Sequence, residues 1–153
     1  RNNNSQYTGA QTTAARSDAG FMQIAMKNGQ LMLSSNAAKV ATVHFTNGSS
    51  RLDAQDRKVL RQVIALQKQN GGVIQIIGHA SSRTRSMEPV THKMVNYKVS
   101  VDRADTIANE MVRLGAQKGS IMIGAVSDSQ PLYYEVMPTG EAGNRRAEIF
   151  IGS

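Results

Sequence analysis

The sequence predicts an α+β domain in which a mixed β-sheet is covered by helices on one face. Two observations lead to this prediction. Short runs rich in β-branched residues, typical of strands, alternate with longer segments whose apolar residues recur at helical spacing. Glycine or asparagine stands at most of the junctions between them. In chain order the elements read β-α-β-α-β, followed by a loop and a last strand.

The strands are expected at 41–45, 73–77, 121–126 and 147–151. The first of them ends at the turn-forming pair Asn47-Gly48. The second is short, β-branched and bounded by glycine on both sides, which favours a buried strand.

Two helices are expected between these strands. Asp53 is a good N-cap for the first helix, which ends at Asn70-Gly71-Gly72. The second helix is predicted to begin at the cap residue Ser100 and to end at Gly115, after a long polar loop.

The first 40 residues fall into two parts. Residues 1–20 contain almost no large apolar side chain, so we expect a flexible linker. Residues 21–40 carry apolar runs on both sides of Asn28-Gly29, which indicates a hairpin or extension. That segment either covers the edge of the domain or forms a strand that docks onto a partner. The domain proper is expected to span 41–153.

Composition narrows the class of protein. The 153 residues include 40% hydrophobic residues and no cysteine, so they offer one core and no disulfide. No apolar run is long enough to span a bilayer and no signal peptide is present, so any membrane anchor is expected to lie outside this chain. The net charge of +7 favours anionic partners. The basic residues are scattered and aromatic residues are few, which disfavours nucleic acid as a partner.

No local motif indicates catalysis, a metal or a cofactor. His44, His79 and His92 are scattered, without the spacing that a zinc site requires. His79 follows a strand and is interpreted as a structural histidine. We therefore expect a protein that is not an enzyme.

Arg103 is the strongest candidate for a binding residue. It lies three residues after Ser100, in what is predicted to be the first turn of a helix. Free N–H groups and a positive dipole there would assist an arginine in binding a carboxylate. The alternative is a structural arginine that bridges to Asp102, Asp105 or a loop carbonyl.

Three ordered blocks add a family resemblance. The blocks are Gly78-His79-Ala80-Ser81, then Asn96 to Ala104, which contains Ser100 and Arg103, and then Asn144-Arg145-Arg146-Ala147-Glu148 with the strand that follows. Over roughly residues 41–151 the chain resembles the OmpA-like C-terminal domain, a peptidoglycan-binding module of the bacterial envelope. The resemblance implies that domain's sandwich of a mixed sheet and helices.

The resemblance also implies a ligand and a set of site residues. Arg103 would bind a carboxylate of diaminopimelate in the wall peptide, and Asn96 would shape the loop before it. Ser81, next to Ala80, stands where the family usually has the aspartate that holds the ligand's ammonium group. Arg145 and Arg146 alternate along a strand, so one of them lies near the ligand, and Arg146 is our candidate.

The loop 82–95 bears on the missing aspartate. It is longer than usual in the family and basic, with Glu88 its single acidic residue. Glu88 either replaces the missing carboxylate or belongs to a solvated insertion, or the basic loop faces a different, anionic partner.

Two functions follow from the resemblance. The first is a non-catalytic envelope module of the periplasm, associated with the outer membrane, that binds peptidoglycan and anchors a larger assembly. The second is a scaffold module that contacts other proteins of an envelope complex, such as a secretion system or motor, and has lost wall binding. Electrostatic binding to anionic lipid is a third, weaker alternative.

Overall fold

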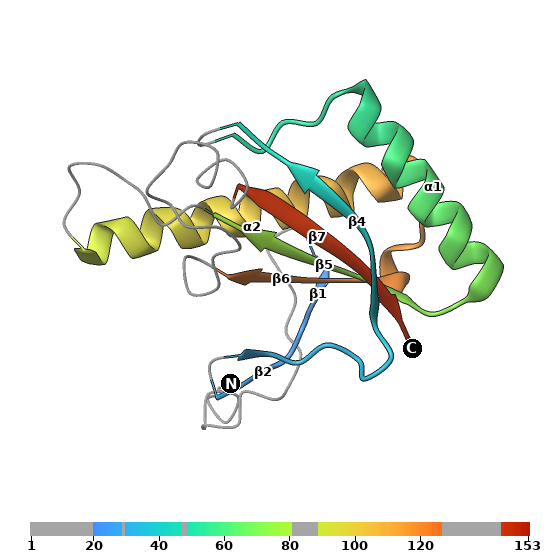
Figure 1. Cartoon of the computed structure of the whole chain (residues 1–153), viewed down its shortest axis with the longest axis horizontal. Helices are drawn as coiled ribbons and strands as arrows, with labels where there is room; N and C mark the ends of the chain where they lie inside the picture. The colour runs from blue at the N-terminus through green and yellow to red at the C-terminus, as the bar shows by residue number, and fades with distance from the viewer. Residues whose placement is uncertain (1–19, 29, 47–48, 81–88, 127–144) are drawn as a thin grey trace.

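The computed structural model describes residues 20–28, 30–46, 49–80, 89–126 and 145–153, with the backbone alone for 89–97. Its strands are β1 (Met22–Gln23), β2 (Met26–Lys27), β3 (Gln30–Leu31), β4 (Ala38–His44), β5 (Val73–His79), β6 (Ile121–Val126) and β7 (Arg146–Gly152). Its helices are α1 (Ala54–Asn70), α2 (Pro89–Arg113) and a short 3-10 turn at Lys118–Ser120 (Figure 1).

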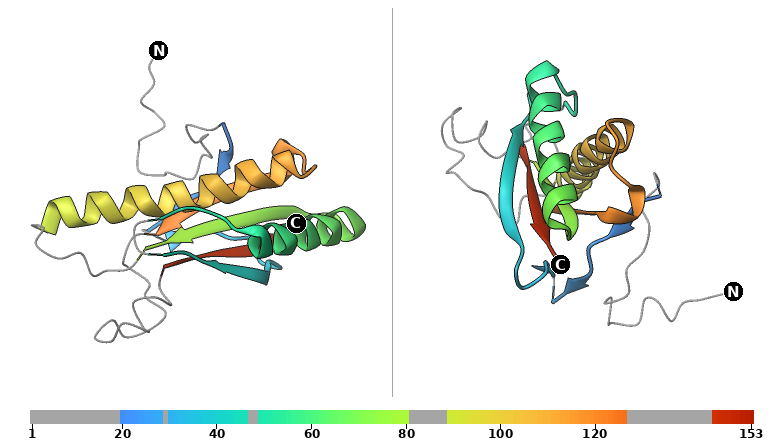
Figure 2. Two further views of the ribbon diagram at one scale, coloured as in Figure 1. Left: turned by 90° about the horizontal axis from the view of Figure 1, so that it is seen from above. Right: turned by 90° about the vertical axis from the view of Figure 1, so that its right-hand side faces the viewer.

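Five of the strands form one mixed sheet in the order β1-β6-β5-β7-β4. β5 and β6 are parallel because α2 connects them, whereas β7 runs antiparallel to both β5 and β4. Both helices lie on the same side of this sheet (Figure 2). The predicted α+β fold with a mixed sheet and helices on one face is therefore confirmed.

The main core lies between the sheet and the helices. Alternate residues of the central strands point into it, including Ile74, Ile76 and Ile149, each with no exposed surface. α1 contributes Leu60 and its neighbours from one helical face. At the start of α1, Asp53 accepts a bond from the Asp56 N–H while the Asp56 side chain accepts one from the Asp53 N–H. This capping box satisfies backbone donors that a helix end otherwise leaves unpaired.

The segment before β4 covers the opposite face of the sheet. β2 and β3 pair as an antiparallel hairpin, and Leu31 packs beside Ile24, Ile77 and Val126 in a second, smaller apolar cluster. Gln75, which is buried, donates from Nε2 to Ser34 Oγ over 3.0 Å and fixes the end of this segment to the sheet.

Phe21 and β1, which precede the predicted domain start at 41, pack against that domain. The Phe21 side chain is 1% exposed in the main core, with the Lys118 ammonium 5.0 Å from its ring centroid. Met22 and Gln23 then pair in parallel with β6. One edge of the five-stranded sheet is thus β1, which lies before residue 41.

Two elements differ from the sequence expectation. The strand predicted at 41–45 is β4, Ala38–His44, which begins three residues earlier and ends one residue earlier. The second difference concerns a helix. The helix predicted to begin at Ser100 begins at Pro89, so Ser100 lies in the middle of α2 and part of the predicted loop 82–95 is helical. Proline is favoured in the first turn of a helix, where its missing N–H costs nothing, and no glycine or proline interrupts the chain from 90 to 113. Ser100 was wrongly interpreted as a cap because its hydroxyl has a distant partner, described below.

Candidate functional site

The first and second sequence blocks meet where α2 crosses β5. An added Cβ at Gly78 would lie 1.9 Å from the carbonyl oxygen of Ser100, so only glycine allows this approach. The Ser100 hydroxyl donates to the carbonyl of Val126 over 2.7 Å, and Ala104 is fully buried. Small residues therefore let the helix backbone rest directly on the two parallel strands.

Arg103 extends from this contact toward the loop after β4. Its Nη1 donates to the His79 carbonyl over 2.8 Å and its Nε donates to the Ser49 carbonyl over 2.9 Å. Its Nη2 donates to the Thr46 carbonyl over 3.2 Å. The guanidinium also lies over the Phe45 ring, 5.1 Å from the centroid. Arg103 therefore joins the end of β5 to the segment between β4 and α1.

The charge of Arg103 has no carboxylate partner within the described part of the chain. The residue is 1% exposed, and its hydrogen-bond acceptors are three neutral carbonyls. Burial, with a smaller contribution from the nearby charge of Arg145, lowers its pKa from the usual arginine range to about 10. At neutral pH it remains a cation, and two of its five N–H donors are not used by these bonds. An anion placed against it would supply the missing countercharge.

The position of Arg103 differs from the sequence argument in one respect. Arg103 lies well inside α2, not in a first turn, so neither unpaired helical N–H groups nor the positive end of the dipole contribute to an anion site. The predicted alternative of a loop carbonyl as partner is present twice, at Thr46 and Ser49, and the third acceptor is the carbonyl of His79 at the end of β5. Arg103 thus has a structural role through these carbonyls and keeps two N–H donors that a ligand could use.

The two arginines of the third block, Arg145 and Arg146, lie on opposite faces of the sheet. Arg145 donates from Nε to the Phe45 carbonyl over 3.2 Å and lies close enough to Arg103 to lower its pKa. Arg146 lies on the opposite face of the sheet, where its Nε donates to Glu148 Oε2 over 3.0 Å. The structure thus brings Arg145, and not Arg146, to the surroundings of Arg103.

The other candidates fall partly within the described chain. Ala80 is 6% exposed and directly follows His79, whose carbonyl binds Arg103. Ser81 and Glu88 lie outside the described residues, and Asn96 lies in α2 with its backbone alone described. Sequence reasoning did not place Phe45 or the carbonyl of Thr46 at the site. The polar segment that follows the first strand is the one signal that could have indicated them.

His79 belongs to the same polar group as Glu148 on the face away from the helices. Its Nε2 lies 3.3 Å from Glu148 Oε1, and the exposed Lys39 ammonium lies 3.6 Å from Glu148 Oε2. Burial lowers the pKa of His79, so the imidazole is neutral at pH 7. The His79 contact and the Arg146 guanidinium lower the pKa of Glu148 from 4.5 to about 2, against burial, which raises it.

These pKa shifts predict that acid destabilises the fold. Below the unfolded pKa of about 6.5 for histidine, the unfolded chain binds a proton that buried His79 does not. Between 4.5 and about 2, the unfolded chain also protonates Glu148 while the folded chain keeps it ionised. Urea unfolding measured from pH 7 to pH 3 should therefore show the free energy of unfolding decrease as the pH falls. In Glu148→Gln the free energy of unfolding should depend less on pH below pH 4.5. Asp102→Asn, which alters an exposed carboxylate, should have the same pH dependence as the natural chain. An unchanged slope in Glu148→Gln would contradict the assignment.

The described residues contain neither a candidate metal site nor a candidate membrane span. Nowhere among them do three or more His, Asp or Glu side chains gather in a way that could hold a metal ion. Neither helix, over the ranges described, is long and apolar enough to cross a membrane.

Comparison with known proteins agrees with the fold and with the family resemblance. A sequence model of the OmpA family matches residues 44–145, more than half of the chain, and the chain belongs to this family. The resemblance inferred from the blocks is therefore confirmed. No curated protein matches the chain in sequence.

Solved structures of similar fold come from several bacteria. The peptidoglycan-associated lipoprotein from Burkholderia pseudomallei is 20% identical with a TM-score of 0.63, over 71% of this chain and 88% of that one. The OmpA-like domain of FopA1 from Francisella tularensis is 16% identical with a TM-score of 0.62, over 91% and 94%. The cell wall anchor of the T6SS from Pseudomonas aeruginosa is 21% identical with a TM-score of 0.61, over 76% and 87%.

Proposed function

We propose that this chain is a non-catalytic module of the bacterial cell envelope that binds the peptide of peptidoglycan and anchors a larger assembly to the wall. The observation that carries the proposal is the buried Arg103 guanidinium, which has no carboxylate partner among the described residues. A buried cation is costly unless it is paired, and a ligand carboxylate is a fitting partner for a guanidinium with N–H donors to spare. The proposed ligand group is a carboxylate of diaminopimelate.

The relatives support the class of function. Two proteins of the same fold are named as peptidoglycan-associated and as a cell wall anchor. By analogy, we propose a periplasmic location with outer-membrane association, any membrane anchor outside this chain, and other envelope proteins as partners.

We further propose how the site is composed. Ala80, Ser81 and Asn96 would surround the ligand beside Arg103, as the family pattern implies. Arg145 would supply the second cation, because Arg146 is engaged by Glu148 on the other face of the sheet.

A second function is favoured by Ser81. A serine hydroxyl accepts one hydrogen bond from an ammonium group but does not neutralise it, and losing a buried charge partner costs on the order of 2–5 kcal/mol of binding. The carboxylate of Glu148 contacts His79 and Arg146 on the face of the sheet away from Arg103 and therefore does not replace it. In this alternative the chain keeps the fold as a scaffold of an envelope complex, such as a secretion system, and no longer binds the wall.

The extent of the domain is also a proposal. Because Phe21 lies in the main core and β1 pairs with β6, we propose that the folded unit includes residues 21–40 together with 41–153. Residues 1–20 would then serve as the linker.

Sedimentation with purified diaminopimelate-type sacculi tests the proposal. At low and moderate salt we expect the natural chain to sediment with the wall, and Ser81→Asp to raise the affinity about tenfold or more in a titration with sacculi, because a carboxylate restores the ammonium partner. Lys58→Gln serves as the control, since it removes an exposed positive charge from α1, away from the site.

The same experiment separates the alternatives. Binding by the natural chain that persists at moderate salt supports wall recognition, because a specific site resists screening better than a diffuse charge. No binding by the natural chain, with binding gained in Ser81→Asp, favours the scaffold. Binding that Lys58→Gln or added salt removes would instead indicate a general attraction for anionic surfaces.

A further inference from the structure

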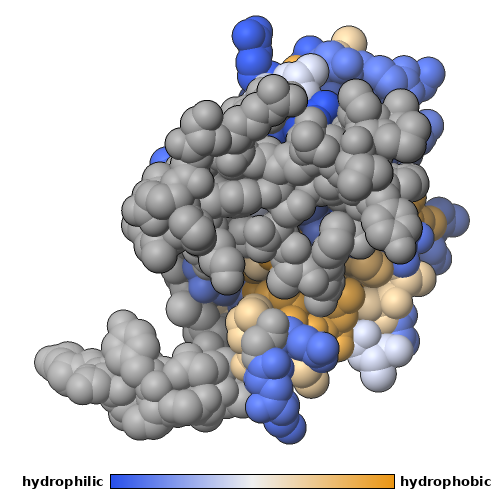
Figure 3. All heavy atoms as spheres, turned by 60° about the vertical axis from the view of Figure 1, so that its left-hand side comes forward, coloured by the Kyte–Doolittle hydropathy of each residue, from blue (hydrophilic) through white to orange (hydrophobic). Residues whose placement is uncertain are grey.

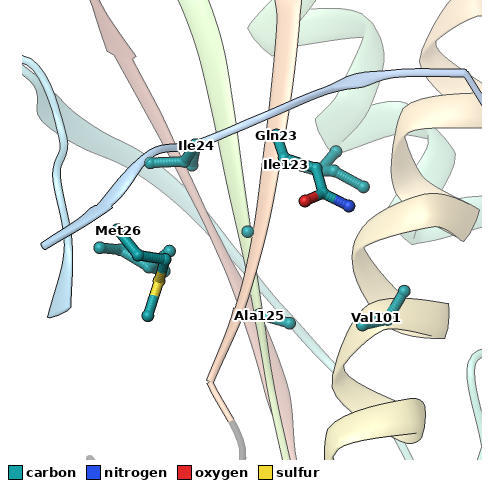
Figure 4. Close-up of a pocket in the computed structure, with 8 residues that line it drawn as sticks. Gln23, Ile24, Met26, Val101, Ile123 and Ala125 are labelled. Atoms are coloured by element: carbon teal, nitrogen blue, oxygen red, sulfur yellow. The ribbon is translucent and has the colours of Figure 1, made fainter. Parts of the chain in front are cut away.

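A small apolar cavity lies at the β1 side of the sheet, away from Arg103. Its volume is about 110 Å³. It is lined by Gln23, Ile24, Met26, Leu31, Val101, Ile123, Gly124 and Ala125. In Figure 4 the labelled side chains come from three elements: the segment around β1 and β2, strand β6, and helix α2. Figure 3 shows apolar side chains gathered at the surface on one face of the molecule, bordered by hydrophilic ones.

The cavity adjoins a strand edge that β1 covers only in part. β1 pairs with Met122 and Ile123, and its last bond on this edge runs from the Ile24 N–H to the Ile123 carbonyl over 2.7 Å. The chain then turns away, since the Ala25 carbonyl accepts from the Met32 N–H within the hairpin segment. β6 itself continues to Val126.

The alternation of the β6 backbone determines which N–H and C=O groups point toward this edge. In a strand, the N–H and C=O groups of every second residue point to the same edge. The groups of Ala125 therefore face the side to which the Ile123 carbonyl points, and no described strand pairs with them there. Ala125 also lines the cavity. Backbone hydrogen-bonding groups and an apolar cavity thus lie side by side.

We propose that this cavity and the adjoining edge of β6 bind an extended peptide segment of a partner protein. The segment would continue the ladder that β1 begins, pair with Ala125 and place one aliphatic side chain in the cavity. A cavity of about 150 Å³ accepts a benzene molecule, so the smaller cavity here suits a side chain such as leucine or valine. Main-chain bonds would supply affinity and the cavity would supply selectivity, as in other strand additions to sheet edges.

The residues that line the cavity favour an aliphatic side chain over a charged group. Seven of the eight described lining residues are apolar or glycine, and the eighth, Gln23, is uncharged, so none of these eight offers a cation to a phosphate or carboxylate. The existing β1–β6 pairing shows that this edge accepts a parallel strand and that a further strand would be continuous with it. Arg103 does not line the cavity, and two of its three hydrogen bonds reach the segment that follows β4, the strand at the opposite edge of the sheet.

A synthetic strand peptide tests the proposal. The probe is a fluorescein-labelled Ser-Thr-Val-Leu-Val-Thr-Ser peptide, and its partner probe has aspartate in place of the central leucine. Fluorescence anisotropy with the full chain should show saturable binding of the leucine probe, and the aspartate probe should bind about tenfold or more weakly. Added salt should change this affinity little, because the site is apolar.

Matched variants of α2 locate the binding. Val101→Gln should weaken the leucine probe about tenfold or more, because it places an amide in the cavity. Val112→Gln makes the same change at a position on α2 that is 37% exposed and does not line the cavity, so binding should be unchanged. Should Val101→Gln unfold, Val101→Met tests the same point by filling the cavity with apolar atoms.

Several results would overturn the proposal. They are no saturable binding of the leucine probe at millimolar concentration, equal binding of the two probes, or equal binding by the Val101 and Val112 variants. Self-association in sedimentation equilibrium that Val101→Gln abolishes would assign the cavity to a second copy of the chain. Sacculus sedimentation of Val101→Gln, run in parallel, keeps this test separate from the proposed wall binding.

Discussion

Replacing Gly78 with alanine is expected to lower the free energy of unfolding by about 3 kcal/mol, at the upper end of what overpacking a core costs. The added Cβ would lie 1.9 Å from the carbonyl oxygen of Ser100 and 3.2 Å from the backbone nitrogen of Ala104. Both atoms belong to the α2 backbone, so no side-chain rotation relieves the clash. The helix would have to move away from β5.

That movement would affect the rest of the site. The Ser100–Val126 hydrogen bond and the contacts of Arg103 all depend on α2 lying directly on the strands. We therefore expect the loss in stability to be accompanied by a loss of whatever Arg103 binds.

Urea unfolding followed by circular dichroism measures the effect. Gly119→Ala is the matched control, because an added Cβ there meets nothing within 4 Å and the change should stay within about 0.5 kcal/mol. Equal stabilities for the two variants would show that α2 moves away from β5 without cost, which would contradict the close packing described here.

Much of the fold was predictable because its signals are local. The strands at 73–77, 121–126 and 147–151 are short β-branched runs between turn residues, and each is present with an extension of at most two residues at either end. α1 begins and ends where its cap Asp53 and the glycines after Asn70 indicate. In these segments, local propensity and tertiary packing favour the same structure.

The start of α2 was not predictable in this way. A serine before an apolar stripe is the usual sign of an N-cap, because its hydroxyl competes for backbone donors. Here the Ser100 hydroxyl is used by the Val126 carbonyl, 26 residues later in the chain, and the helix continues through this position. A single sequence contains no sign of that long-range acceptor.

The candidate site was also predictable only in part. The second sequence block indicated Arg103 as a binding residue. Its acceptors at Thr46 and Ser49, however, come from a loop more than 50 residues earlier in the chain. The arginines at 145 and 146 were recognised as alternating, yet only the sheet register shows which of them lies beside Arg103. The pairing of β1 with β6 is likewise a contact between distant segments that no local pattern specifies.

Replacing Arg103 with methionine is the second substitution with a large expected effect, a loss of about 2–5 kcal/mol in the free energy of unfolding. Two opposing contributions decide its size. Burial lowers the pKa of Arg103 to about 10, which corresponds to a cost of roughly 3 kcal/mol for keeping the buried side chain charged, and methionine removes this cost. Against this, three hydrogen bonds from a charged donor are lost, each worth about 1.5–3 kcal/mol. The hydrogen bonds prevail because the carbonyls of His79 and Ser49 would lose this charged donor, whereas the Thr46 carbonyl keeps only the bond that it accepts from the Ser49 N–H.

Arg103→Lys separates charge from geometry. A lysine ammonium keeps the positive charge but does not reproduce the planar fork that reaches three carbonyls from one side chain. We therefore expect Arg103→Lys to be destabilised to an extent similar to Arg103→Met. Arg113→Met is the control, since that guanidinium is 64% exposed and pairs with Glu110 on the same helix, and its effect should be much smaller. Full stability in Arg103→Lys would mean that charge alone is needed, which would contradict the bridging role.

A bound anion should change the balance of these contributions. If a carboxylate neutralises the buried guanidinium, the strain on its charged form decreases, and the complex is more stable than the free chain. Free diaminopimelate at millimolar concentration should then raise the Tm of the natural chain and leave the Tm of Arg103→Met unchanged. The same concentration of lysine, which has one carboxylate fewer, is the ligand control and should raise the Tm less. Equal shifts in the natural chain and Arg103→Met would leave Arg103 with the bridging role alone, and the fold would then be stabilised by this arginine without its acting as a binding residue.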